Sequence, residues 1–184
     1  MRKLLIVLMS LALTGSTMAG PALAASVEDP VKSVMDIAVG RWLENSSGQD
    51  YFDKPAIDDL YSEAFQAAYH EAEKYPAYDG GTSPFEYDVI TSSQDGCPLK
   101  DLEITESGPK GGVTTVDVSF RLWDCAETAE EKAKISELRF DVITESGKAV
   151  IDDIHRKPEG KWDSLKAELQ EIVKAGQQSE SKPQ

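Results

Sequence analysis

The sequence has few of the residues that metal, thiol and nucleic-acid chemistry need. Its 184 residues include two cysteines and two histidines, and 19 basic residues stand against 33 acidic ones. The histidines have no metal-binding spacing, and nucleophile-elbow, phosphate-loop and dinucleotide motifs do not occur. The formal net charge of −14 disfavours nucleic acids and anionic membrane surfaces as partners, because both would repel the chain. We therefore expect no cofactor and no metal site.

Long apolar runs are also missing, apart from a short one near the start. Arg2 and Lys3 precede the apolar segment 4–14, and the small residues of segment 22–24 follow it. This order is typical of a secretory signal peptide over 1–24, and the run is shorter than the roughly 20 residues of a membrane-spanning helix. We expect cleavage, a periplasmic or secreted location, and no membrane insertion afterwards. Loss of the two basic residues would change the net charge from −14 to −16.

Export determines how the cysteines are interpreted. Cys97 and Cys125 are an even pair, and in an oxidising compartment a disulfide is the default. We assume that the glycine-rich stretch between Glu106 and Val113 turns a hairpin and that these two residues pair. Cys97 then lies near residue 122 of the partner strand, close to Cys125. The sequence therefore predicts a structural Cys97–Cys125 disulfide. A redox pair, which usually has the spacing Cys-x-x-Cys, is the alternative.

Three segments have the apolar spacing of amphipathic helices. Apolar residues that recur every three or four positions predict helices over 30–44 and 55–74, and a short C-terminal helix over about 162–172. Segment 75–95 is irregular, with several prolines and glycines, and predicts a long ordered loop. The polar tail 176–184 is expected to be disordered.

After Cys97 the pattern becomes alternating, and it predicts four antiparallel strands. A last strand is expected over 149–156, after a Ser-Gly turn. Strands that follow helices predict an α+β domain over 25–175, with two N-terminal helices packed on a curved four-stranded sheet. The residues expected to face the core from the first three strands are Leu102, Ile104, Val116, Val118, Phe120, Leu122, Leu138, Phe140 and Val142.

Two stretches of the sequence resemble a known family. Segment 84–90 (PFEYDVI), followed by segment 94–96 (QDG), is similar to the stretch before the first strand in exported bacterial proteins of the domain of unknown function 3828 family. Segment 150–154 (VIDDI) resembles the last strand of that family, although the turn at 147–149 lacks the family's tryptophan. The resemblance covers about residues 30–156. It implies a nuclear-transport-factor-2-like, or cystatin-like, cone fold and an exported location, and no established activity.

The implied cone fold makes the last strand the place to look for catalysis. Cone folds enclose an apolar pocket. Some members are isomerases or dehydratases that use an Asp or His inside this pocket. Asp152 points inward in one phase of the strand, and Asp153 and His155 do so in the other, because alternation allows one set per face unless a bulge intervenes. We favour hydrogen-bonded or solvated carboxylates over catalytic ones.

The long loop supplies the candidate binding residues. Tyr87, Asp88, Gln94 and Asp95 are expected either to form a polar rim at the pocket mouth or to tie the loop to the sheet, with a turn at Asp95. We favour the structural role.

These observations favour an exported, non-catalytic domain that binds a small ligand or a protein. The second hypothesis is an inhibitor or immunity-type protein, because the acidic charge would attract a basic envelope protein. A small pocket enzyme of the isomerase or dehydratase kind is the third hypothesis.

Overall fold

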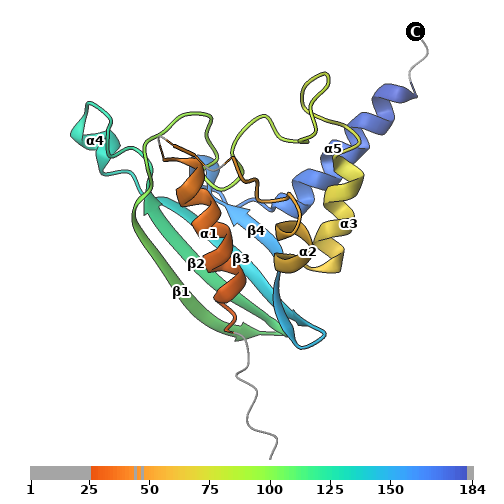
Figure 1. Ribbon diagram of the computed structural model, residues 1–184, viewed down its shortest axis with the longest axis horizontal. Coiled ribbons are helices and arrows are strands. Elements are labelled where there is room, and N and C mark those ends of the chain that lie inside the picture. Colours follow the sequence, from red (N-terminus) through yellow and green to blue (C-terminus); the bar gives the residue numbers. More distant parts are fainter. Residues whose placement is uncertain (1–25, 44, 47, 182–184) are drawn as a thin grey trace, which may run out of the picture.

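The computed structural model describes residues 26–43, 45–46 and 48–181, so the expected signal peptide 1–24 lies outside the described residues. The described chain is an α+β domain in which the helices pack against one face of a four-stranded antiparallel sheet and along its β4 edge (Figure 1). The predicted fold class is therefore confirmed. Within the described part, no helix is both long enough and apolar enough to cross a membrane.

The N-terminal helices differ in one respect from the prediction. Helix α1 (Asp29–Arg41) matches the first expected helix, whereas α2 (Ala56–Leu60) and α3 (Glu63–Ala72) replace the single helix predicted over 55–74. The break has a tertiary cause. The backbone N–H of Ser62 donates to the carbonyl of strand residue Ile151 at 2.8 Å. This N–H therefore points to the sheet, and α2 does not continue through Ser62.

Ser62 then starts α3. Its Oγ accepts a hydrogen bond from the backbone N–H of Phe65 at 3.0 Å, as an N-cap residue does. Ser62 is completely buried, so the contact with the sheet and the cap occupy the same point. The stripe of apolar residues continues across the break, which is why periodicity alone predicts one helix.

The sheet consists of four consecutive strands in the order β1-β2-β3-β4. The strands are β1 (Lys100–Lys110), β2 (Val113–Arg121), β3 (Ser136–Glu145) and β4 (Lys148–Arg156), and the short helix α4 (Ala129–Lys132) lies between β2 and β3. The four predicted strands are confirmed.

The first hairpin is tighter than predicted. Its turn is the pair Gly111-Gly112, whose φ angles of 64° and 87° are both in the region that favours glycine. Lys110 therefore pairs with Val113, and the predicted pairing of Glu106 with Val113 is wrong. The six-residue turn assumed from the composition is mostly strand.

The cysteines nevertheless meet where the sequence predicted. Register shifts in β1 compensate for the tighter turn, and the backbone N–H of Cys97 donates to the carbonyl of Leu122 at 2.8 Å. Cys97 and Cys125 form a disulfide, with 5.8 Å between their Cα atoms. The predicted disulfide is confirmed.

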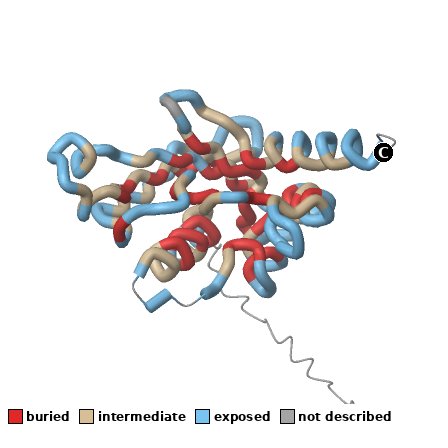
Figure 2. The backbone as a smooth tube through the Cα atoms, turned by 90° about the horizontal axis from the view of Figure 1, so that it is seen from above, coloured by how far each residue is buried: buried red, intermediate tan, exposed pale blue. Residues whose placement is uncertain are grey.

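The core lies between the sheet and the helices. Figure 2 shows the buried positions gathered in the middle of the molecule, where these layers meet. The predicted inward residues of β2 and β3 are almost completely buried; they are Val116, Val118, Phe120, Leu138, Phe140 and Val142. These side chains, together with those of α1 and α3, form one apolar cluster.

A bulge in β4 resolves the two phases that the sequence left open. Ile151 and Asp153 pair with consecutive residues of β3, so Asp152 is an extra residue in the ladder. As a result, Ile151 and Ile154 are both fully buried, although strict alternation would place them on opposite faces. Neither predicted phase describes the whole strand.

The C-terminal helix is longer than predicted. A 3-10 turn, η1 (Pro158–Gly160), leads from β4 toward α5 (Leu165–Glu180). The prediction of a disordered tail over 176–184 is wrong for residues 176–180, and residues 182–184 lie outside the described part. Gly176 lies inside the helix and does not end it. Its lack of a side chain lets α5 pack closely against Tyr75, because a Cβ at this position would overlap the Tyr75 ring. Figure 2 shows α5 reaching beyond the rest of the domain.

Candidate functional site

A hollow of about 640 Å³ opens beyond the C-terminal end of α1. Its walls come from described residues between 41 and 52, at the end of α1 and beyond it, and from residues between 83 and 94 in the long loop. We call this hollow the loop groove. Figure 1 shows both segments at the same end of the molecule. Aromatic rings and charged groups line it together, including Trp42 and Glu86.

Asp88 holds the two walls of the loop groove together. One carboxylate oxygen accepts hydrogen bonds from the backbone N–H groups of Ile90 and Thr91, both at 3.0 Å. The other accepts from the Tyr51 hydroxyl at 2.7 Å and from Nε of Arg41 at 3.3 Å. The Asp88 side chain is 9% exposed, so these contacts occupy nearly all of it. Its position in the structure is that of a loop anchor.

Arg41 is the cation of the loop groove. Its guanidinium pairs with Asp50 at 3.0 Å and lies 5.0 Å from the centre of the Tyr51 ring. Partial burial acts to lower the pKa of Arg41, but the charges of Asp50 and Asp88 and the hydrogen bond to Asp88 outweigh it and raise the pKa above its ordinary value. The guanidinium therefore stays charged.

A close approach of backbone fixes Trp42. A Cβ at Gly96 would lie 2.9 Å from the Trp42 ring and 2.6 Å from the Leu122 side chain. Glycine at this position therefore allows the loop to pass directly over both. The Nε1 of Trp42 is buried and has no hydrogen-bond partner among the described residues.

The four predicted binding residues are only partly brought together. Tyr87, Asp88 and Gln94 line the loop groove, and Gln94 Nε2 donates to the carbonyl of Glu86 at 2.9 Å. Asp95 is exposed outside the groove lining, where its backbone N–H donates to Ser93 Oγ at 3.3 Å. Asp95 lies at a bend of the loop, and the turn that the sequence predicted at this residue stays a prediction.

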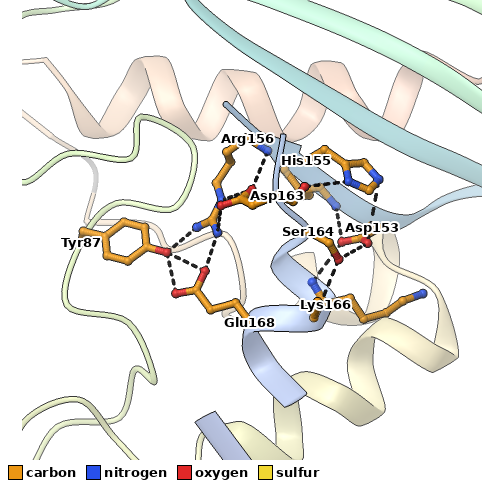
Figure 3. A network of polar contacts seen from close by, with 10 residues as sticks. Tyr87, Asp153, His155, Arg156, Asp163, Ser164, Lys166 and Glu168 are labelled. Carbon is orange, nitrogen blue, oxygen red and sulfur yellow. Dashed lines mark hydrogen bonds and ion pairs between the residues drawn. The ribbon is translucent and has the colours of Figure 1, made fainter. Parts of the chain in front are cut away.

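Tyr87 connects the loop groove to a buried arginine (Figure 3). Its hydroxyl donates to Glu168 of α5 at 2.6 Å and accepts a short hydrogen bond from Arg156. Arg156 is 3% exposed, and its guanidinium also pairs with Asp163 at 2.7 Å and closely with Glu168. Burial and the hydrogen bond to Glu168 raise the pKa of Tyr87 above its ordinary value. One wall of the groove is therefore pinned to β4 and α5.

The two aspartates of the bulge are occupied at helix starts. Asp153 accepts from Ser164 Oγ at 2.5 Å and from the backbone N–H of Lys166 at 3.0 Å, which completes the first turn of α5. Asp152 accepts from Ser62 Oγ and from Lys166 Nζ, both at 2.7 Å. Both carboxylates thus join β4 to neighbouring helices.

The charge state of Asp152 follows from these contacts. Partial burial acts to raise the pKa of Asp152, but the hydrogen bonds from Lys166 and Ser62 and the charge of Lys166 hold it below its ordinary value. A general acid or base at neutral pH needs a raised pKa instead.

His155 lies between two hydrogen-bond acceptors. Its Nδ1 is 2.8 Å from the carbonyl of Asp163, and its Nε2 is 2.9 Å from the carboxylate of Asp141. Partial burial acts to lower the pKa of His155, but these two bonds and the charges of Asp153 and Asp141 raise it above 6.5. The ring borders a shallow hollow of about 460 Å³ beside Trp162. It ties the segment before α5 to β3.

Sequence reasoning missed the two arginines that organise the site. Arg156 follows Ile154 in the inward phase of β4, and an arginine at an inward position signals a buried ion pair. Its partners could not be named, because Tyr87, Asp163 and Glu168 come from separate segments. The sequence did not single out Arg41, because a basic residue at the end of an amphipathic helix is ordinarily exposed to solvent. Among the described residues, no group of three or more His, Cys, Asp or Glu could hold a metal ion.

The fold and the site together define an α+β domain with an open, aromatic and acidic groove built on loops. Comparisons of the chain with protein-family models, with curated proteins and with solved structures gave no match. The resemblance to the domain of unknown function 3828 family stays a prediction.

Proposed function

We propose that the protein is an exported, non-catalytic binding domain whose ligand or partner occupies the loop groove. The observation that carries this proposal is that the acidic candidates hold the fold together, whereas the groove faces solvent. The acidic candidates Asp152, Asp153 and Asp88 each accept two or more hydrogen bonds that join segments of the fold. The groove itself presents aromatic and polar surface to solvent.

The interior supports binding at the groove over catalysis in a cone. The apolar cluster between sheet and helices is filled by side chains such as Phe65, Phe120 and Phe140. A pocket enzyme would need a carboxylate or imidazole facing a substrate there. The proposed export is supported by the sequence of segment 1–24 and fits the disulfide.

The proposal is tested with a variant that fills the groove. The protein is purified from its native host and examined by native mass spectrometry, together with Ser46→Trp. Ser46 is exposed and lines the loop groove. We expect a bound species on the wild type and its loss from the variant. The same spectrum should show a chain that begins at Ala25.

The matched control is Ser179→Trp, which places the same bulk on the exposed end of α5. It should retain the bound species. A wild-type protein that carries nothing, or a bound species that survives Ser46→Trp, would refute the groove as the binding site. Turnover of a substrate that stops in Asp152→Asn or Asp153→Asn would instead establish the enzyme hypothesis.

A further inference from the structure

The loop groove has an excess of negative charge. Among the described residues that line it, Asp50, Glu86 and Asp88 are acidic and Arg41 alone is basic. The sign agrees with that of the whole chain, which carries a formal net charge of −14. A hollow lined by charges of one sign concentrates the field of the protein and attracts ions of opposite sign.

The groove already contains one example of what such a lining binds. The guanidinium of Arg41 lies between the carboxylates of Asp50 and Asp88 and over the ring of Tyr51. A planar cation is thus held by carboxylates on its edge and by an aromatic ring on its face. This internal contact uses up Asp88, whose side chain is only 9% exposed.

Other acidic and aromatic groups of the lining keep surface that this internal contact does not cover. Glu86 is exposed, and its carboxylate makes no ion pair or hydrogen bond with another described residue. Asp50 pairs with Arg41 and still keeps 37% of its side chain exposed. Trp42 is one of the aromatic residues of the lining, and an indole is the best of the aromatic groups for attracting a cation.

We infer that the loop groove takes an arginine or lysine side chain of a basic protein partner, at Glu86, Asp50 and Trp42. This inference rests on the proposed function and names the occupant of the same groove. A free amine is a poorer occupant. Exposed ion pairs and one cation–ring contact are individually weak, so such an amine would bind with a Kd above about 1 mM. A basic protein adds contacts around the groove and is steered by the charge of the chain.

The test is an NMR titration of the isotope-labelled protein with a blocked peptide of alternating glycine and arginine. A peptide with glutamate in place of arginine serves as its counterpart. We expect the arginine peptide to shift the indole N–H signal of Trp42 and the amide signals of Glu86 and its neighbours. Binding should weaken at least about threefold between about 20 and about 200 mM salt, because the contacts are exposed ion pairs.

Two charge reversals locate the effect. Glu86→Lys should abolish the shifts, whereas Glu106→Lys, which makes the same charge change at an exposed position of β1, should leave them within about twofold. Equal weakening by both variants would mean that net charge alone acts, and would overturn the inference. Shifts that lie outside the groove would overturn it too.

The two proposals fail in different ways. Binding of the glutamate peptide in the groove would overturn the cationic occupant and leave groove binding standing. A groove that no peptide perturbs, on a protein whose native bound species also survives Ser46→Trp, would overturn both.

Discussion

At the scale of single residues, Arg156 connects more segments than any other side chain of the site. A guanidinium that is 3% exposed needs partners for its donors, and it finds them in the loop at Tyr87, before α5 at Asp163, and on α5 at Glu168. Loss of one partner of a buried ion pair typically costs about 3–5 kcal/mol. The wall of the loop groove thus depends on an interaction outside it.

His155 gives the stability of the protein a dependence on pH. Its pKa in the folded state is raised, so protonation favours folding. The stabilisation is fully present below the unfolded-state pKa of about 6.5 and is lost as the pH rises through the folded-state pKa. We expect His155→Gln to lower the free energy of unfolding by about 1 kcal/mol at acidic pH and by less at alkaline pH. Urea unfolding at several pH values measures this difference.

The control for that series is His70→Gln, which removes the other histidine from the exposed face of α3. A difference between wild type and His155→Gln that grows with rising pH would contradict the assigned hydrogen bonds to Asp141 and Asp163.

At the scale of elements, the contact between α5 and the segment after α3 depends on a glycine. Replacing glycine by alanine inside a helix usually stabilises it by about 0.5–1 kcal/mol. In Gly176→Ala the new Cβ would overlap the ring of Tyr75, and overpacking costs about 1–3 kcal/mol. We expect a net loss of about 1–2 kcal/mol in the free energy of unfolding.

Urea unfolding followed by circular dichroism measures this effect. Ser179→Ala, on the exposed end of the same helix, tests alanine without a neighbouring ring and should be neutral or slightly stabilising. If Gly176→Ala were as stable as Ser179→Ala, the packing of α5 against Tyr75 would be wrong.

The kinds of elements were predictable from sequence, whereas their interruptions were not. Apolar period predicted correctly which segments are helical and which are strands, because burial imposes that period, and it missed where the helices break and end. The break at Ser62, the bulge at Asp152 and the continuation through Gly176 each depend on a contact with a distant segment. The candidate site divides in the same way. Tyr87 and Gln94 could be singled out by their place in a loop and do line the groove, whereas the place of Arg41 there needed the folded chain.

At the scale of the whole molecule, the disulfide links the chain before β1 to the chain after β2. Cys97 and Cys125 are 28 residues apart, and a closed loop of that size stabilises a protein by about 3–4 kcal/mol in the chain-entropy model. We expect the double variant Cys97→Ala/Cys125→Ser to lose about that much free energy of unfolding, measured in urea.

Reduction of the wild type supplies the control for the double variant. Both forms should unfold at similar urea concentrations, because both lack the covalent link. A reduced wild type that unfolds like the oxidised protein would show that the link contributes nothing to stability.

The bulge in β4 raises the question of whether the strand needs its extra residue, Asp152. If Asp152 were deleted, Ile151 and Asp153 would become neighbours, and they already pair with consecutive residues of β3. The shortened strand would alternate regularly and would still direct Ile151 and Ile154 into the core. The extra residue is therefore not required by the sheet. A deletion would instead remove the carboxylate that accepts hydrogen bonds from Ser62 and Lys166. The one extra residue therefore joins β4 to the starts of α3 and α5.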